Sequence, residues 1–214
     1  MIVNDSIVTY MHSLEKPNSQ VLETIEKQAR IDNVPIIRKE MESFLRVMLS
    51  IKKPKRILEL GTAVGYSAIL MSESIESDAQ IVTIENYEKR IPIARENIAK
   101  AGKEEAITLL EGDAMEIMPG LDGDQFDFVF MDAAKAQYIN FLPEVLRLMK
   151  DGAILITDNV LQDGDLIESK YVVRRRNRTI HKRMREYMKV VKNHPQLETA
   201  IVPIGDGITM SVKK

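Results

Sequence analysis

Hydrophobic residues along this chain form two alternating patterns. Short, nearly continuous apolar runs, typical of strands buried on both faces, lie at residues 56–60, 80–85, 106–112, 126–132 and 153–159. Between these runs, apolar residues recur at helical spacing over residues 65–75, 87–102, 114–121 and 138–150. Alternation of buried strands with amphipathic helices predicts an α/β fold, with a mostly parallel sheet and helices on both faces.

The N-terminal part of the chain has a helical pattern. One helix is predicted at residues 20–32, where Asn18 or Ser19 provides the N-cap, and another at residues 38–53. Pro35 disfavours helical backbone at the residue before it, so we expect these two helices to be separate.

The C-terminal part returns to strands. Residues 197–205 and 207–214 are two apolar runs joined by the turn sequence Ile-Gly-Asp-Gly, which predicts an antiparallel hairpin at the edge of the sheet. With the five runs above, the pattern predicts a Rossmann-like sheet of seven strands. We expect a single domain over residues 1–214, with an N-terminal helical extension at 1–52 and an α/β core at 53–214.

The composition is that of a globular protein. Of the 214 residues, 44% are hydrophobic, 29% are charged and none is cysteine, which excludes disulfides and thiolate chemistry. The N-terminus has no apolar core of signal-peptide type, and no apolar run approaches the roughly 18 residues of a membrane span. We therefore predict a soluble, cytoplasmic protein with no membrane partner.

Glycines and acids follow the first three predicted strands, at the edge where parallel sheets bind ligands. Gly61 and Gly65 permit a tight turn and a close approach of the backbone to a ligand. Glu85 suits ribose hydroxyls, and Asp113 can contact the edge of a nucleobase. The chain has no GxGxxG or Gly-Lys-Ser/Thr motif, so these residues indicate a nucleoside without a phosphate chain, such as S-adenosylmethionine. The alternative is a set of ordinary connections with solvated acids.

The fourth and fifth predicted strands also end in oxygen-bearing side chains. Asp132 ends the fourth predicted strand, and Asp158 and Asn159 end the fifth. Hard oxygen ligands without His or Cys favour Mg²⁺, or another divalent cation such as Mn²⁺ or Ca²⁺, over zinc. The alternative is that the two aspartates are helix N-caps.

Four motifs then reveal a family resemblance. The sequences ELGTAVGYS (59–67), DAAKAQY (132–138), TDNVLQDG (157–164) and PIGDGITM (203–210) resemble the metal-dependent class I O-methyltransferases of the catechol and caffeoyl-CoA type. The resemblance extends over residues 30–214 or so, with the motifs in the family's order.

This resemblance implies specific roles for residues. It implies a metal site made of Asp132, Asp158 and Asn159, and a catalytic role for Lys135, as a base or charge partner, together with Asp132. The residues implied to contact S-adenosylmethionine are Ile37, Glu59, Gly61, Ser67, Glu85, Asp113, Ala114 and Asp132. One departure is Phe141, where many relatives have tyrosine, and it affects the details of the acceptor pocket.

The chemistry of such a site restricts the acceptor. A neutral hydroxyl is a poor nucleophile near pH 7, and a divalent cation that grips two adjacent oxygens lowers its pKa and fixes its approach. The acceptor must therefore offer vicinal oxygens. A catechol has them, and so does 5-hydroxyuridine, whose hydroxyl lies next to the C4 carbonyl.

Positive charge is concentrated in one stretch, residues 170–189, which we call the basic segment. It holds nine Lys or Arg residues and one acid, and it leaves 21 bases against 31 acids in the rest of the chain. A helix over residues 178–191 would place Arg178, Lys182, Arg185 and Lys189 on an exposed stripe opposite an apolar face that docks on the domain. We expect Arg174, Arg175 and Arg176 to contact phosphates and His181 to add to the basic face.

The position of the basic segment, between the Asp158–Asn159 motif and the last strands, resembles the bacterial tRNA 5-hydroxyuridine methyltransferases. The resemblance implies synthesis of 5-methoxyuridine at the wobble position, with the anticodon loop of tRNA as the partner. The expected RNA-binding residues are Arg174, Arg175, Arg176, Arg178, Lys182 and Arg185. It also implies a homodimer, with the N-terminal helices as the natural contact.

Other interpretations stay open at this point. The basic segment can be a solvated amphipathic helix, or it can bind an acidic small substrate or an anionic surface. The protein can be a catechol-type small-molecule methyltransferase, or an RNA-binding protein with an inactive methyltransferase fold. The intact set of Asp132, Asp158, Asn159 and Lys135 argues against the last of these.

Overall fold

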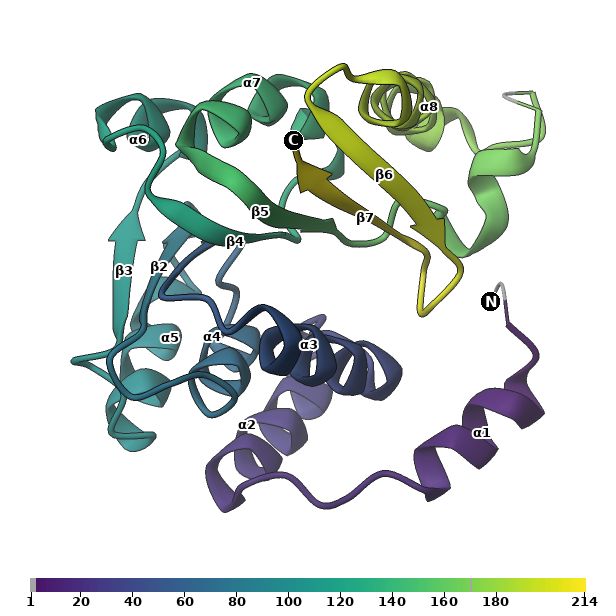
Figure 1. Ribbon diagram of the computed structural model, residues 1–214. Helices are drawn as coiled ribbons and strands as arrows, with labels where there is room; N and C mark the ends of the chain where they lie inside the picture. The colour runs from purple at the N-terminus through teal and green to yellow at the C-terminus, as the bar shows by residue number, and fades with distance from the viewer. Residues whose placement is uncertain (1–2, 170) are drawn as a thin grey trace.

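A seven-stranded sheet with the order β3-β2-β1-β4-β5-β7-β6 forms the centre of the molecule (Figure 1). This computed structural model describes residues 3–169 and 171–214; Lys170, the first residue of the predicted basic segment, lies outside the described residues. The strands are β1 Arg56–Leu60, β2 Gln80–Glu85, β3 Ile107–Glu111, β4 Phe126–Met131, β5 Met149–Thr157, β6 Leu197–Val202 and β7 Ile208–Lys213. Strands β1 to β5 pair in parallel, whereas β7 is antiparallel to β5 and β6. The predicted fold class is confirmed.

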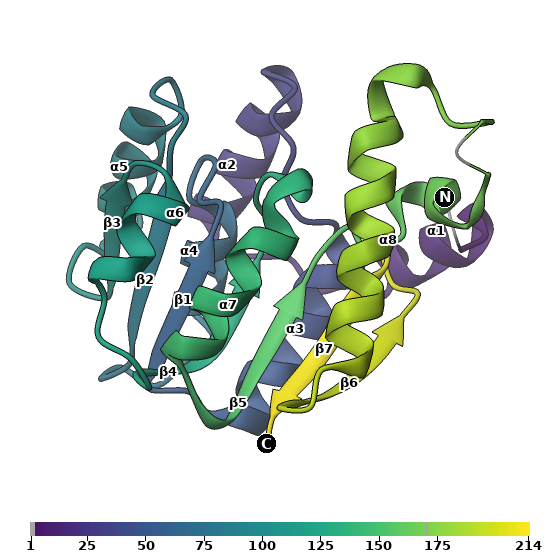
Figure 2. The same cartoon turned by 90° about the horizontal axis from the view of Figure 1, so that it is seen from above.

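Helices cover both faces of the sheet. They are α1 Asp5–Ser13, α2 Gln20–Ile31, α3 Lys39–Lys52, α4 Tyr66–Ser72, α5 Ile91–Lys100, α6 Ala114–Ile117, α7 Tyr138–Leu148 and α8 Arg178–Asn193. Helices α2 to α5 lie on one face, and α6, α7 and α8 lie on the other, which Figure 2 shows in front. No helix in the described part of the chain combines the length and the apolar character needed to cross a membrane.

Two hydrophobic clusters, one on each face, hold these layers together. On one face, buried residues of α2, α3 and α4 pack with Ile57, Phe128 and Ile156 of the sheet. On the other face, Tyr138 of α7 packs with Tyr187 of α8, with ring centroids 5.7 Å apart in an edge-on contact. The predicted orientation of α8 is confirmed, because Met184, Tyr187 and Val191 are buried while Arg178, Lys182, Arg185 and Lys189 are exposed.

Helix α1 was not among the bounded predictions, and a second difference from the predicted elements is at β5. This strand begins at Met149, within the helix predicted at 138–150, because Met149 pairs with Phe126 of β4 and is buried in the sheet. The register then shifts before Phe128 pairs with Ile154. The apolar side chain of Met149 continues the helical pattern of α7, so periodicity alone gives no sign of the transition.

The parallel register brings the ends of β1, β4 and β5 side by side. Leu60 pairs with Met131, which pairs with Thr157. The next backbone amides continue the ladder: Asp132 N–H donates to the Leu60 carbonyl at 2.9 Å, and Asp158 N–H donates to the Met131 carbonyl at 3.0 Å. Gly61, Asp132 and Asp158, which follow strands far apart in the sequence, therefore become neighbours at one edge of the sheet.

Candidate active site

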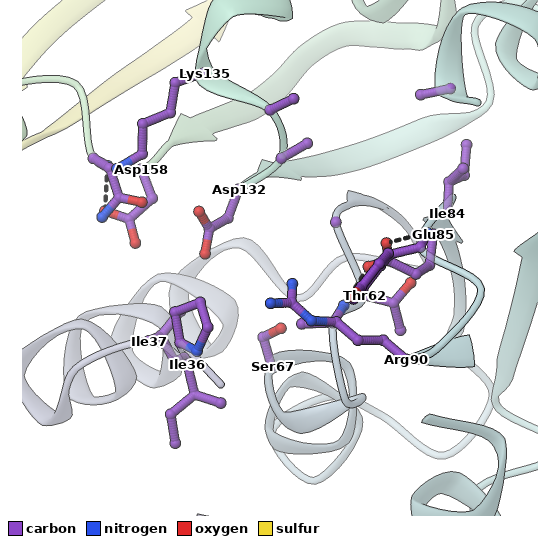
Figure 3. A pocket seen from close by; sticks show the side chains of 18 of the residues that line it. Ile36, Ile37, Thr62, Ser67, Ile84, Glu85, Arg90, Asp132, Lys135 and Asp158 are labelled. Atoms are coloured by element: carbon purple, nitrogen blue, oxygen red, sulfur yellow. Dashed lines mark hydrogen bonds between the residues drawn. The ribbon is translucent and has the colours of Figure 1, made fainter. Parts of the chain in front are cut away.

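A cavity of 670 Å³ lies at the carboxyl ends of the parallel strands β1 to β5 (Figure 3). Its wall contains all of the predicted cofactor-binding, catalytic and metal-binding residues except Glu59: Ile37, Gly61, Ser67, Glu85, Asp113, Ala114, Asp132, Lys135, Asp158 and Asn159. The fold thus gathers residues from six different connections around one space, as expected for the edge of an open α/β sheet.

Gly61 makes a close contact between two of the loops that line this cavity. Its backbone has φ +99°, a conformation that side chains strongly disfavour. A Cβ atom at this position would lie 2.1 Å from the carbonyl oxygen of Asp132. Only glycine allows the loop after β1 to lie directly against the start of the loop that carries Asp132 and Lys135.

Glu85 connects the loop after β1 with the loop after β2. Its Oε2 accepts a hydrogen bond from the Ala63 N–H at 2.7 Å, and its Oε1 accepts from the N–H groups of Asn86 at 3.1 Å and Tyr87 at 2.8 Å. The carboxylate, buried at the base of the wall, therefore organises the glycine loop and the β2 turn around the position predicted for a ribose.

Glu59 lies one layer behind the cavity wall. Its carboxyl group is fully buried and accepts hydrogen bonds of 2.5 Å from the hydroxyls of Ser67 and Thr83. Burial raises the pKa of Glu59 to about 7, although the two hydroxyls oppose that shift. Ser67 itself faces the cavity, so Glu59 reaches a bound ligand through Ser67.

Asp132 and Asp158 extend into the cavity from adjacent strands, with Lys135 beside Asp158 (Figure 3). Burial raises the pKa of Asp132, and Lys135 opposes the shift. Burial, followed by the charge of Asp132, raises the pKa of Asp158 to about 7. Two carboxylates that disfavour each other's ionised form are an arrangement that a nearby cation stabilises.

Neither aspartate is the N-cap of the segment that follows it. Ala134 occupies that position before the 3₁₀ turn Lys135–Gln137, and Leu161 occupies it before the turn Gln162–Ile167. Asp113, in contrast, is the N-cap of α6 and accepts the N–H of Met115 at 2.8 Å. The N-cap alternative therefore describes Asp113, not Asp132 or Asp158.

The family follows from comparison with known proteins. The sequence profile described as O-methyltransferase matches residues 11–214 of this chain. The chain belongs to this O-methyltransferase family. Caffeoyl-CoA O-methyltransferase 1 of Eucalyptus globulus is 33% identical over 181 residues, which are 78% of this chain and 70% of that relative. Catechol O-methyltransferase of Mycobacterium tuberculosis is 29% identical over 178 residues, which are 79% of this chain and 76% of that relative.

A solved structure agrees with this placement. The O-methyltransferase of Bacillus cereus in complex with SAH has a TM-score of 0.86 and 25% sequence identity, covering 98% of this chain and 97% of that one. The coarse prediction of an O-methyltransferase of the catechol and caffeoyl-CoA type is therefore confirmed.

The donor atoms of this O-methyltransferase fit a divalent cation. The two buried carboxylates supply negative charge, and Asn159 adds an amide next to Asp158 in the left-handed region at φ 58°. The Asn159 Nδ2 donates to Asp206 Oδ2 at 3.3 Å, which leaves the amide oxygen as the remaining donor atom. Among the described residues no group of three or more His, Asp or Glu side chains is placed to hold a metal ion, so the candidate set depends on this amide. An all-oxygen set suits Mg²⁺.

Sequence reasoning missed three charged residues in the cavity wall: Arg38, Arg90 and Asp206. Arg38, just before α3, forms a salt bridge of 2.5 Å with Asp206, which lies in the turn between β6 and β7. Asp206 in turn accepts from Asn159. Asp206 lies in the motif PIGDGITM, which the family resemblance had singled out, but nothing in the sequence pairs that residue with Arg38. The pair links the N-terminal region to the predicted metal ligands.

The basic segment joins the same region through α8. Arg183 donates to the carbonyl of Ala136 at 3.0 Å, and the residues on either side of Ala136, Lys135 and Gln137, line the cavity. In Figure 2 the chain between β5 and α8 extends beyond the N-terminal end of α8, at the edge where the arrowheads of β1 and β5 lie. The segment therefore borders the side of the cavity that carries Lys135.

The predicted RNA-binding side chains fall into two groups. All six are exposed, and Arg174, Arg175, Arg176 and Lys182 form the first group. Arg178 donates to the carbonyls of Val173 and Tyr171, each at 3.3 Å, and Arg185 donates to the Glu168 carbonyl at 3.4 Å. Arg178 and Arg185 thus hold the loop before α8, a role that a helical wheel does not reveal.

The prediction that His181 adds to the basic face is wrong. Its side chain is only 2% exposed, and its Nε2 donates to the Glu168 carbonyl at 3.1 Å. On α8 it lies between the exposed stripe and the buried face, and packing against the preceding loop decides its environment.

Proposed function

We propose that this O-methyltransferase transfers a methyl group from S-adenosylmethionine to the hydroxyl of 5-hydroxyuridine at the wobble position of tRNA, with a divalent cation. One observation carries the proposal: a cavity with two buried carboxylates and a lysine is joined, through Arg183 and Ala136, to an exposed arginine-rich segment. The cavity supplies the chemistry, and the segment supplies charge for a polyanionic acceptor.

The wall of the cavity supports S-adenosylmethionine as the methyl donor. The Bacillus cereus relative is described in complex with SAH. In this chain, Glu85 and Asp113 line the cavity at successive strand ends, which supports the predicted contacts to ribose hydroxyls and a nucleobase. Gly61 lets the loop after β1 lie against the Asp132 backbone, which brings both loops into the cavity wall.

The chain's own residues can then divide the reaction among them. A divalent cation bound by Asp132, Asp158 and Asn159 would supply positive charge that lowers the pKa of an acceptor hydroxyl. Lys135, beside Asp158, receives the hydroxyl proton or stabilises the oxyanion. The methyl carbon exchanges its bond to the sulfonium sulfur for a bond to the acceptor oxygen, and the electron pair of the broken bond stays on sulfur. Two hydrogen bonds orient the two side chains that follow β5: the Asn159 backbone N–H donates to Asp158 Oδ1, and Asn159 Nδ2 donates to Asp206 Oδ2.

RNA fits the outside of the cavity better than a small catechol does. A catechol needs no cationic surface, whereas an anticodon loop brings phosphates on both sides of an unpaired base. Arg174, Arg175 and Arg176 are exposed and consecutive, and Lys182 continues the positive charge along α8. These residues support tRNA as the acceptor.

The deciding experiment is nucleoside mass spectrometry of tRNA from a strain that lacks this protein. We expect loss of 5-methoxyuridine and accumulation of 5-hydroxyuridine, reversed by the wild-type gene and not by an Asp158→Ala variant. Unchanged 5-methoxyuridine would exclude the proposed acceptor.

A second candidate is a catechol-type small-molecule methyltransferase. The names of the Mycobacterium tuberculosis and Eucalyptus globulus relatives favour it. Purified protein assayed with S-adenosylmethionine and Mg²⁺ separates the two. A kcat/KM for a catechol that exceeds the value for a 5-hydroxyuridine stem-loop would favour the small molecule.

The homodimer stays a prediction. Helix α1 buries none of its residues and exposes Ile7 and Tyr10, and its C-cap Leu14 is exposed too, so we propose α1 as the contact surface between two copies. Sedimentation of the wild type and of an Ile7→Glu variant would test this assignment.

A further inference from the structure

The three most exposed large apolar side chains of the described residues lie close together in the sequence. Ile167 is 79% exposed, Tyr171 73% and Val172 71%. They belong to a short stretch before the arginine triplet, residues 167–169 and 171–173, which we call the apolar loop. Only 5% of the chain is aromatic, so an aromatic ring on this surface needs an explanation.

The apolar loop is held in place from both ends and from α8. Leu166 just before it and Val173 at its end are buried. The N–H groups of Val172 and Val173 donate to the Ser169 carbonyl at 2.9 and 3.3 Å, which closes a turn. This turn directs Val173 into the protein and leaves Tyr171 and Val172 exposed.

Three side chains of α8 fix the carbonyls of the loop. His181 and Arg185 donate to Glu168, and Arg178 donates to Tyr171 and Val173. Two of these donors are cations that could otherwise extend toward a ligand. Their use as supports for the backbone indicates that the exposed position of the apolar side chains is a built feature of the surface.

The surroundings of the loop select among possible partners. Arg174, Arg175 and Arg176 follow it directly and are exposed, so a partner that covers the loop must also satisfy strong positive charge. Unpaired RNA does both, because its bases stack on aromatic rings while its phosphates bind arginine. Charge complementarity thus favours single-stranded RNA over an apolar protein surface.

The loop is also connected to the catalytic cavity. The chain that leads to it starts at the predicted metal ligand Asn159, and Leu161 N–H donates to the Asp206 carbonyl at 3.0 Å. In Figure 2 this stretch lies at the edge of the molecule where the arrowheads of β1 and β5 end. An RNA loop whose target base enters the cavity would pass over it.

We propose that the apolar loop is a stacking platform, centred on Tyr171, for an unpaired base near the methylated base. This inference rests on the proposed RNA function and adds a second binding site for the anticodon loop, distinct from the phosphate contacts. The platform contributes through base stacking, whereas the arginines contribute through charge.

The test compares kcat/KM for a 5-hydroxyuridine anticodon stem-loop with kcat/KM for the free 5-hydroxyuridine nucleoside. We expect Tyr171→Ala to lower the stem-loop to nucleoside ratio by roughly 5- to 150-fold, the range for removing one aromatic stacking partner. Tyr171→Phe should retain the ratio, because stacking needs the ring and not the hydroxyl. The control is Ile51→Ala, which removes a side chain 70% exposed at the other end of the sheet and should leave the ratio unchanged.

A second readout separates stacking from charge. Loss of Tyr171 should weaken stem-loop binding equally at all salt concentrations, because stacking releases no counterions. The chain contains no tryptophan, so Tyr171→Trp introduces a single reporter whose fluorescence a stacked base should quench. Unquenched emission at saturating stem-loop would overturn the platform.

The outcomes distinguish the two proposals. Wild-type protein that methylates neither the stem-loop nor the nucleoside overturns both the RNA function and the platform. Wild-type protein that methylates the stem-loop, with Tyr171→Ala unchanged in its ratio, overturns the platform alone. Binding to vesicles of anionic phosphatidylglycerol that Tyr171→Ala abolishes, with RNA activity unaffected, overturns it in favour of a membrane surface.

Discussion

The cavity at the strand ends and the basic segment before and along α8 are built in different ways. In the cavity, backbone ladders place Asp132 and Asp158, and a glycine contact closes the wall. In the basic segment, the side chains of Arg178 and Arg185 hold backbone carbonyls, and the arginine triplet 174–176 is exposed to solvent. Strand pairing in the sheet fixes the positions of the cavity residues, whereas side chains of the single helix α8 hold the loop of the basic segment.

This difference separates two tasks. Chemistry that involves buried carboxylates needs fixed geometry and exclusion of water, which the core of the sheet provides. Recognition of a large acceptor needs exposed charge and rings, which an attached loop can supply without disturbing the core. Changes in the cavity should therefore lower turnover on every acceptor, and changes in the basic segment should lower turnover on RNA alone.

The largest effect is expected from Asp158→Ala. Removing this carboxylate should lower kcat by at least about a thousandfold on both the stem-loop and the nucleoside, because metal assistance contributes several kcal/mol. The check is a methylation assay with calorimetric titration of Mg²⁺, with circular dichroism to confirm folding. Asp122→Ala, which removes an exposed aspartate, is the matched control. Full activity of Asp158→Ala on either acceptor would contradict the metal site.

Gly61→Ala should have the next largest effect. The new Cβ would collide with the Asp132 carbonyl and force an unfavourable φ, so we expect a loss of about 3 kcal/mol in the free energy of unfolding. Gly102→Ala is the control, because Gly102 also has a positive φ, +62°, but nothing lies within 4 Å of the position that a Cβ would occupy there. It should lose only about 1 kcal/mol. Equal losses in urea denaturation would show that backbone strain, and not the loop contact, decides the effect.

Replacement of Arg174, Arg175 and Arg176 by alanine should affect RNA alone. We expect roughly 10- to 100-fold weaker stem-loop binding at low salt, and a salt dependence whose slope is reduced by about 2, because three phosphate contacts are lost. Fluorescence anisotropy at several salt concentrations measures both quantities. Alanine at the exposed residues Lys16, Lys27 and Lys100 is the control. A slope that did not change would assign the basic segment to a solvated surface.

The cavity was more predictable from sequence than the basic segment. Asp132 and Asp158 each follow an apolar run, and parallel pairing of those runs is enough to make them neighbours. The salt bridge between Arg38 and Asp206 was not predictable, because tertiary packing alone brings these distant residues together. The roles of Arg178 and Arg185 were hidden for a similar reason, since their partners are backbone carbonyls. Periodicity predicts the exposed face of a helix but not what folds back onto it.

The smallest effect tests the wall behind the cavity. Burial raises the pKa of Glu59 from its ordinary 4.5 to about 7, so the folded protein holds this proton more tightly than the unfolded chain. Stability from this group is therefore greatest at low pH and decreases as pH rises from about 4.5 to 7. Between pH 5.5 and 6.5 the loss should be about 1 kcal/mol. Glu59→Gln, which cannot ionise but keeps two polar atoms for Ser67 and Thr83, should lack this decrease. Urea denaturation of both proteins at the two pH values isolates the contribution, because every other titrating group is common to them. Parallel pH profiles would mean that Glu59 stays ionised in the folded protein. The hydroxyls of Ser67 and Thr83 would then be enough to stabilise a buried carboxylate behind the cavity wall.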